Sequence, residues 1–116
     1  MVLLRASGEE AGETYDLSAI HGDGSDGGGV PAGVELIAFA DALLGDDDAV
    51  LNRAREGLRR AVGDKGLVDA AGVAATFNAI DRIADATGIP LEDKKAEISA
   101  GFRADLAIDS YADGRA

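Results

Sequence analysis

The 116-residue chain has no cysteine and no tryptophan, only two prolines, and only 4% aromatic residues. The absence of cysteine excludes disulfides, thiolate metal sites and catalysis by a thiol nucleophile. Because aromatics are scarce, Ala, Leu, Val and Ile must fill the core, with Phe39, Phe77 and Phe102 as its expected large members. This composition, 47% hydrophobic, favours closely packed helices in a single domain.

Long hydrophobic runs are missing as well. No stretch approaches the ~20 apolar residues that span a bilayer, and the beginning, Met1 to Arg5, turns polar too early for a secretory signal. We therefore expect a cytoplasmic protein that binds no membrane. The sequence offers no feature that requires a cofactor, and we expect none.

Positive charge is scarce: 11 Lys and Arg stand against 22 Asp and Glu, a net charge of −11. Nucleic-acid binding needs a cationic surface that displaces counterions, so we expect no nucleic-acid partner. The charge is also unevenly spread. Residues 1–48 contain eleven acidic residues and one basic residue, a net −10, whereas residues 49–116 contain eleven acidic and ten basic residues, a net −1.

The first 30 residues differ in composition from the rest. Ser7 to Asp16 is acidic and weakly apolar, and Gly22 to Gly29 is largely glycine, which has high backbone entropy and little to bury. We predict that residues 1–30 are an acidic, glycine-rich arm or loop, and that residues 31–116 form a helical domain. The aspartates among these glycines lack the spacing and the terminal Glu of an EF-hand, so no metal site is expected.

Apolar residues recur at helical spacing from Pro31 onward. Leu36, Phe39 and Leu43 predict an amphipathic helix that begins near Pro31 and ends at Gly45.

A second helix is predicted between the three aspartates at 46–48, which offer an N-cap and negative charge in the first turn, and Gly63. Its polar side carries several arginines, among them Arg53, Arg59 and Arg60. An anion-binding role is one interpretation of this basic side. Pairing with acidic residues of the same chain is the simpler one, and we favour it.

The longest predicted helix runs from about Leu67 to Ala86 and would be about 30 Å long. Helical spacing gives it one apolar stripe, Ala70, Val73, Phe77, Ile80 and Ala84. A second stripe of small residues, Ala71, Ala75 and Ala79, would let another helix approach closely. Two stripes indicate contacts on two sides, one within the chain and one with a second copy. We therefore expect a homo-oligomer, either a dimer or a larger assembly.

A polar sector lies between the two stripes and contains Asn78, Arg82 and Asp85. These three residues are the candidate site for a small anionic ligand. In the alternative interpretation the sector is a solvated face, in which Arg82 pairs with Asp85 at i+3 and with Asn78 at i−4.

Gly88 is the expected C-terminal cap of this helix, and Pro90 prevents its continuation. A fourth helix is predicted from Leu91 or Glu92 to about Ala107. Its stripe of Ile98, Phe102 and Leu106 is narrow, which is typical of a helix at the edge of a bundle. The expected architecture is an all-α bundle of about four helices that homo-oligomerisation completes.

Three stretches carry a family resemblance: Leu36 to Leu44, Leu67 to Ala71, and the run Phe77-Asn-x-x-x-Arg-Ile-Ala-Asp-Ala-Thr-Gly-Ile-Pro-Leu91. Together they resemble the C-terminal half of the alkylhydroperoxidase D-like and carboxymuconolactone decarboxylase superfamily, over about residues 30–92. The resemblance implies an all-α fold and assembly of homo-oligomers through helices of this kind.

The chain differs from that superfamily in the residues that carry out the superfamily's reactions. The peroxidase branch uses a Cys-x-x-Cys pair with a histidine and a glutamate, and a chain without cysteine cannot reduce peroxide through a thiolate. The decarboxylase branch needs polar acid and base groups from upstream helices, which are short or absent here. His21 is the one histidine and the candidate proton carrier.

Three interpretations of function stay open at this stage. The favoured one is a shortened superfamily member without a redox site that serves as a binding or structural homo-oligomer. The second is a non-thiol enzyme in which His21, Glu35 or the pair Asn78 and Arg82 binds an anionic substrate. The third is an interaction module whose acidic arm binds a basic partner. Whether the chain is catalytic at all is left open, apart from the excluded thiol peroxidase activity.

Overall fold

The computed structural model describes residues 2–21 and 26–110, with side chains from residue 6 onward, and every regular element in these ranges is helical. Four α-helices follow one another: α1 (Val2–Ala11), α2 (Gly33–Leu44), α3 (Asp48–Thr87) and α4 (Asp93–Asp105). Two short 3-10 helices, η1 (Leu17–Ile20) and η2 (Gly27–Gly29), lie between α1 and α2. The predicted all-α class with about four helices is confirmed.

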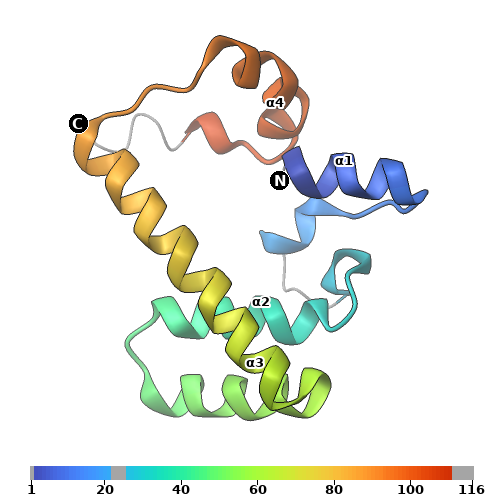
Figure 1. The fold of residues 1–116 in the computed structure, drawn as a ribbon, viewed down its shortest axis with the longest axis vertical. Coiled ribbons are helices and arrows are strands. Elements are labelled where there is room, and N and C mark those ends of the chain that lie inside the picture. Colours follow the sequence, from blue (N-terminus) through green and yellow to red (C-terminus); the bar gives the residue numbers. More distant parts are fainter. Residues whose placement is uncertain (1, 22–25, 111–116) are drawn as a thin grey trace.

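Figure 1 shows how these elements are arranged. Helix α2 and the first part of α3 (residues 48–62) run side by side in opposite directions, joined by a short loop. The chain then bends, and the second part of α3 (residues 64–87) leads diagonally past α2 and away from it. Helices α1 and α4 lie at the other end of the molecule. The second part of α3 therefore has neighbours mainly at its beginning.

Helix α2 is buried through the positions that its spacing predicted. It begins at Gly33, two residues after Pro31, and its last turn closes when the Gly45 N–H donates to the Ala42 carbonyl at 3.3 Å. Phe39 and Ala42, three residues apart, are buried. The predicted helix and its end at Gly45 are confirmed.

The first part of α3 is fixed at its beginning by a side-chain cap. Oδ1 of Asp47 accepts hydrogen bonds from the backbone N–H groups of Ala49 at 2.8 Å and Val50 at 3.0 Å, which satisfies two donors that a helix start leaves unpaired. Leu58, two turns farther along, is fully buried. The predicted cap among the three aspartates is confirmed.

Gly63 divides α3 into its two parts. Its φ of 76° and ψ of 175° lie in a region that is essentially restricted to glycine. The predicted break at this residue is confirmed. Helical structure resumes directly after it rather than at Leu67, because no loop residues are needed when one glycine makes the whole bend.

Gly88 ends α3 in a left-handed conformation with φ 66°, and its N–H donates to the Ala84 carbonyl, as its predicted role as a C-terminal cap requires. Helix α4 follows from Asp93. Phe102 and Leu106 are buried, whereas Ile98, the third residue of the predicted stripe, is 57% exposed. Phe102 and Leu106 line a small hollow together with Leu17, which places the end of α4 next to η1.

The N-terminal segment differs from the predicted loop or arm. Val2–Ala11 form α1, and residues 17–20 and 26–29 form structured turns. The prediction is therefore wrong for Ser7 to Ala11, which are helical. The glycines from Gly27 onward form an ordered turn, which is one form of the predicted loop, because the conformational freedom of glycine also permits tight, ordered turns. Residues 22–25 of the predicted arm lie outside the described residues.

The hydrophobic core is small. Among the residues whose side chains are described, the buried apolar ones are Phe39, Ala42, Leu58, Phe102 and Leu106. Phe77, predicted as a core residue, is instead 59% exposed, because the second part of α3 turns that side away from the rest of the chain. Within the described part of the chain, no helix is long and apolar enough to cross a membrane.

Candidate functional site

The predicted polar sector lies on the exposed second part of α3. Nε of Arg82 donates to Oδ1 of Asn78 at 2.8 Å, so the structure brings these two residues together. The pairing of Arg82 with Asp85 stays a prediction. An arginine that is already engaged by the amide four residues away is typical of a solvated helix face.

His21 and Glu35 lie on other elements. His21 follows η1 and is exposed, and its backbone N–H donates to the Ser18 carbonyl at 2.9 Å. Glu35 is half-buried on α2 and lines a groove with Arg53 of α3. The hollows that we describe are lined by residues other than His21, Asn78, Arg82 and Asp85. The candidate catalytic residues are thus distributed over three segments of the chain.

Protein sites for metal ions are built from several imidazole or carboxylate side chains that converge on one point. The described residues hold no group of three or more His, Asp or Glu side chains placed to bind one metal ion.

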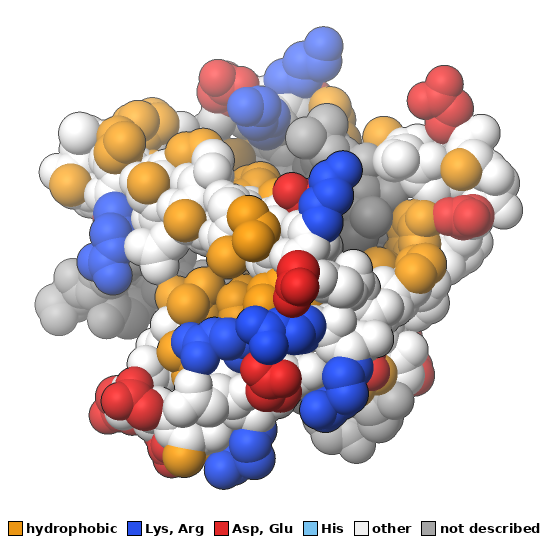
Figure 2. Space-filling model, turned by 60° about the horizontal axis from the view of Figure 1, so that its bottom comes forward, with side chains coloured by type: hydrophobic (Ala, Val, Ile, Leu, Met, Phe, Trp, Pro, Cys, Tyr) orange, Lys and Arg blue, Asp and Glu red, His pale blue; other side chains and the backbone are white. Residues whose placement is uncertain are grey.

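Figure 2 shows several Lys and Arg side chains beside a band of apolar side chains on one face of the molecule. Arg59 pairs with Glu56 at 3.1 Å and with Asp64 at 3.0 Å. Nη1 of Arg55 donates to Oδ1 of Asn52 at 2.6 Å. Pairing within the chain, the favoured interpretation, is confirmed for Arg59, and its partners are neighbours on the same helix.

The exposed stripe on α3 is the largest departure from the predicted packing. Val73, Phe77 and Ile80 are 59%, 59% and 53% exposed, and Ala84 continues the same line four residues later. Their spacing of four, three and four residues places them on one side of the helix. We call Val73, Phe77, Ile80 and Ala84 the apolar stripe. Of the second predicted stripe, Ala71 is half-buried, and Ala75 and Ala79 are exposed.

A turn of three glycines was missed at the sequence level. Gly27, Gly28 and Gly29 have φ values of 63°, 65° and 79°, which L side chains rarely adopt. A Cβ on Gly28 would lie 2.5 Å from the Asp16 carbonyl oxygen. The Asp16 N–H donates to the Gly28 carbonyl at 3.0 Å, so the turn and η1 are joined directly.

Gly33 completes this close approach, because a Cβ there would lie 2.2 Å from the Gly27 carbonyl oxygen. The turn therefore packs backbone against backbone on the first turn of α2. The signal in the sequence was the run Asp26-Gly-Gly-Gly, an aspartate followed by glycines, which is typical of a tight turn.

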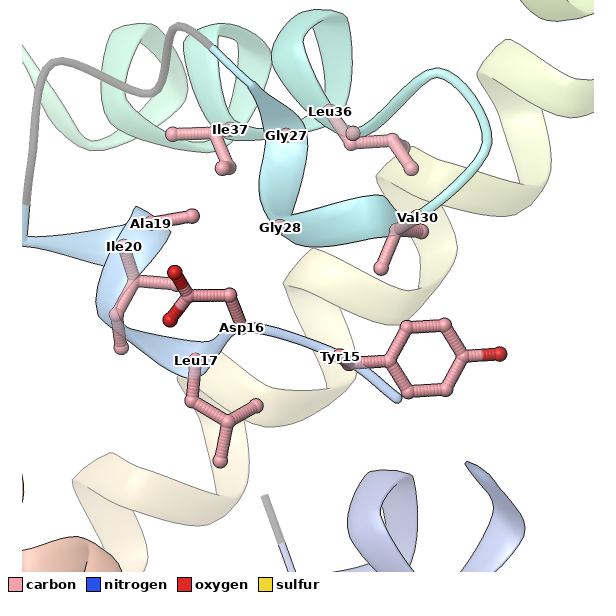
Figure 3. Close-up of a pocket in the computed structure, with 11 residues that line it drawn as sticks. Tyr15, Asp16, Leu17, Ala19, Ile20, Gly27, Gly28, Val30, Leu36 and Ile37 are labelled. Carbon is pink, nitrogen blue, oxygen red and sulfur yellow. The ribbon is translucent and has the colours of Figure 1, made fainter. Parts of the chain in front are cut away.

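A cavity of about 170 Å³ lies between η1, the glycine turn and α2. Figure 3 shows Ile37 above Ala19 and Ile20, with the backbone of Gly27 and Gly28 beside the space that these side chains border. The ring of Tyr15 points away from these side chains. The interior that remains is almost entirely aliphatic.

Two carboxylates lie around this cavity and the next hollow, each held by its own turn. Oδ1 of Asp16 accepts from the Ser18 N–H at 2.9 Å and from the Ser18 hydroxyl at 2.7 Å, and these bonds lower the pKa of Asp16. Oδ1 of Asp26 accepts from the Gly28 N–H at 2.9 Å. The Tyr15 hydroxyl donates to Glu13, which raises the pKa of Tyr15.

Comparison with known proteins gives no relative for this chain: no family model, no curated protein and no solved structure matches it.

Proposed function

We propose that this protein is a non-catalytic subunit of a helical homo-oligomer, which buries its apolar stripe against a second copy of the same chain. The observation that carries the proposal is the exposure of Val73, Phe77 and Ile80 on one side of an isolated helix. An apolar surface of this kind on a water-soluble helix marks an interaction site. The sequence resemblance, which implies homo-oligomers built through such helices, agrees with it.

The chain exposes more surface than a compact monomer of its size, which favours burial of part of that surface against a second copy. The chain exposes 8426 Å², whereas a compact monomer of 11.8 kDa is expected to expose about 5,900 Å². The radius of gyration of 15.5 Å likewise exceeds the ~13.4 Å expected for a compact domain of this length. A second copy would cover the surface that the chain leaves open.

The charge distribution permits this association. Most of the net charge lies in residues 1–48, with −10, and residues 49–116 carry only −1. The apolar stripe belongs to the nearly neutral region and contains no ionisable group. Two copies can therefore meet along α3 without bringing their acidic segments into direct contact.

The catalytic alternative has less support. General acid and base chemistry needs polar groups that meet at a substrate site, and none of His21, Asn78 and Arg82 lines the hollows described above. The cavity beside η1 is aliphatic and does not include His21. We accordingly retain the favoured interpretation, a shortened alkylhydroperoxidase D-like protein without a redox site, as part of the proposal.

The test compares two valines on the same helix. Val73 lies on the apolar stripe and is 59% exposed, whereas Val68 is 69% exposed and lies about 140° away around the helix. We expect Val73→Glu to dissociate the oligomer, because a charge would have to be buried at the interface without a partner. Val68→Glu should leave the assembly intact.

Light scattering coupled to size-exclusion chromatography measures both masses at the same protein concentration. If the two variants had the same mass as the wild type, the stripe would not be the interface. If both dissociated, the interface would not be confined to the stripe. Circular dichroism of each variant confirms that the helices are retained.

A further inference from the structure

The cavity between η1, the glycine turn and α2 has the dimensions of a ligand site. Its volume of about 170 Å³ is comparable to that of an engineered apolar cavity of about 150 Å³ that binds benzene. Leu17, Ile20 and Leu36 supply aliphatic walls, and the glycine backbone closes one side. A single aromatic ring or a short alkyl chain fits this space.

A second hollow adjoins the first and gives it a polar edge. It shares Tyr15, Asp16 and Gly28 with the cavity and adds Asp26. Each aspartate uses Oδ1 for the backbone of its own turn, and Oδ2 of neither has a hydrogen-bond partner among the described residues. Asp16 therefore lines both hollows, and Asp26 adds a second carboxylate to the adjoining one.

The sign of the local charge selects the ligand. The cavity is built entirely from residues 15–37, which belong to the segment that carries −10 over residues 1–48. An anion entering this region is repelled, and a cation is attracted. The site thus differs in both place and charge preference from the anion site predicted at Asn78, Arg82 and Asp85.

We propose that the cavity binds a small apolar molecule that carries one positive charge, with its apolar part between Ile20 and Ile37 and its cationic group beside Asp16 and Asp26. Burial of the ring or chain supplies most of the affinity, and the carboxylates supply the preference for a cation. The site lies on η1, η2 and α2, apart from the apolar stripe, so it does not depend on the proposed oligomer.

Three probes of nearly equal size test the proposal by amide chemical-shift titration of the full chain. Benzylammonium carries the positive charge, benzyl alcohol is neutral, and benzoate is negative. We expect saturable shifts centred on Ala19, Ile20 and Ile37, with the tightest binding for benzylammonium and the weakest for benzoate. We expect this order of affinities because the three probes share the same ring and differ mainly in charge.

Two sets of variants separate the roles of shape and charge. Ala19→Leu fills the cavity and should abolish the shifts caused by benzylammonium and benzyl alcohol, whereas Ala40→Leu, on an exposed part of α2 outside the cavity, should leave them unchanged. Asp16→Asn combined with Asp26→Asn keeps both turns, since asparagine caps as well as aspartate. This double variant should lower the affinity for benzylammonium by about two- to fivefold, the range expected for an exposed ion pair, and leave the affinity for benzyl alcohol unchanged.

We expect dissociation constants on the order of 1 mM for ligands of this size. Three results would overturn the proposal. They are the absence of a saturable shift with any probe up to about 20 mM, equal affinity for benzoate and benzylammonium, and unchanged binding by a folded Ala19→Leu variant. If Ala19→Leu fails to fold, the double aspartate variant decides alone. Loss of the cation preference in that variant supports the site, and an unchanged preference contradicts it.

Discussion

Gly28 and Gly33 are the residues that bring the N-terminal segment into contact with α2. A Cβ on either one would overlap a backbone oxygen, of Asp16 at 2.5 Å and of Gly27 at 2.2 Å. Backbone atoms cannot move aside as a flexible side chain can, so the turn depends on both glycines. The cavity depends on them as well, because the same turn forms one of its walls.

Gly33→Ala should therefore destabilise the protein by roughly 1–3 kcal/mol, the usual cost of forcing extra atoms into a packed site. Gly72→Ala is the matched control, since a Cβ there meets nothing within 4 Å and the residue lies inside α3. That control should gain about 0.5–1 kcal/mol from helix propensity. Urea denaturation measures both changes in the free energy of unfolding. Equal stability of the two variants would show that Gly33 does not pack closely against the Gly27 carbonyl.

Asp16 makes a pH-dependent contribution to the same turn. Hydrogen bonds from Ser18 lower its pKa in the folded chain below the ordinary value of 3.8. A carboxyl whose pKa falls on folding stabilises the native state above the unfolded value, and this stabilisation is lost as the pH falls through the lowered pKa. Between pH 5 and pH 2 the wild type should therefore lose more thermal stability than Asp16→Asn. Parallel pH profiles for the two proteins would contradict the effect.

The residues of this turn could not be found from composition. Glycine content indicates freedom of the backbone, and both a disordered arm and a tight left-handed turn use that freedom. The partners that decide between them, Asp16 and Gly33, are known only once the segments have been brought together. The predicted polar pair fared better, since Asn78 and Arg82 are four residues apart on one helix and their bond is local.

Gly63 controls the direction of the longest element. It lies inside α3 with φ 76° and ψ 175°, and a Cβ there would meet nothing within 4 Å. Backbone conformation alone thus requires glycine at this position. The bend directs the second part of α3, and with it the apolar stripe, away from α2.

Gly63→Ala should destabilise the bent fold by about 1–3 kcal/mol, because alanine is strained in this conformation. Gly57→Ala, six residues earlier in the same helix and equally unobstructed, should instead stabilise it by about 0.5–1 kcal/mol. Thermal denaturation followed by circular dichroism compares the two. A stable Gly63→Ala protein whose helices had merged into one straight rod would show that the bend is not needed for folding.

The helices themselves were largely predictable because their signals are local. An N-cap among the aspartates at 46–48, a break at Gly63 and a C-terminal cap at Gly88 were all predicted from the sequence and are present, with Asp47 as the capping residue. The exposure of Phe77 was not predictable, because helical spacing identifies an apolar side but not what faces it. That depends on the direction set at Gly63, which is a property of the whole chain.

At the scale of the whole molecule, the open shape and the small core have one explanation. Leu58 is the largest fully buried side chain among those the structure describes, and the fold leaves Val73, Phe77 and Ile80 in contact with water. A chain with so little buried apolar surface gains much of its stability from association. Folding and assembly should therefore be coupled, so that thermal stability rises with protein concentration.

Sedimentation equilibrium at micromolar concentration measures the mass of the wild-type protein in solution and so tests whether the chain forms a homo-oligomer. We expect a mass of at least twice the 11.8 kDa of one chain. A single species of 11.8 kDa over the whole concentration range would contradict it, because the apolar stripe would then be exposed in a stable monomer.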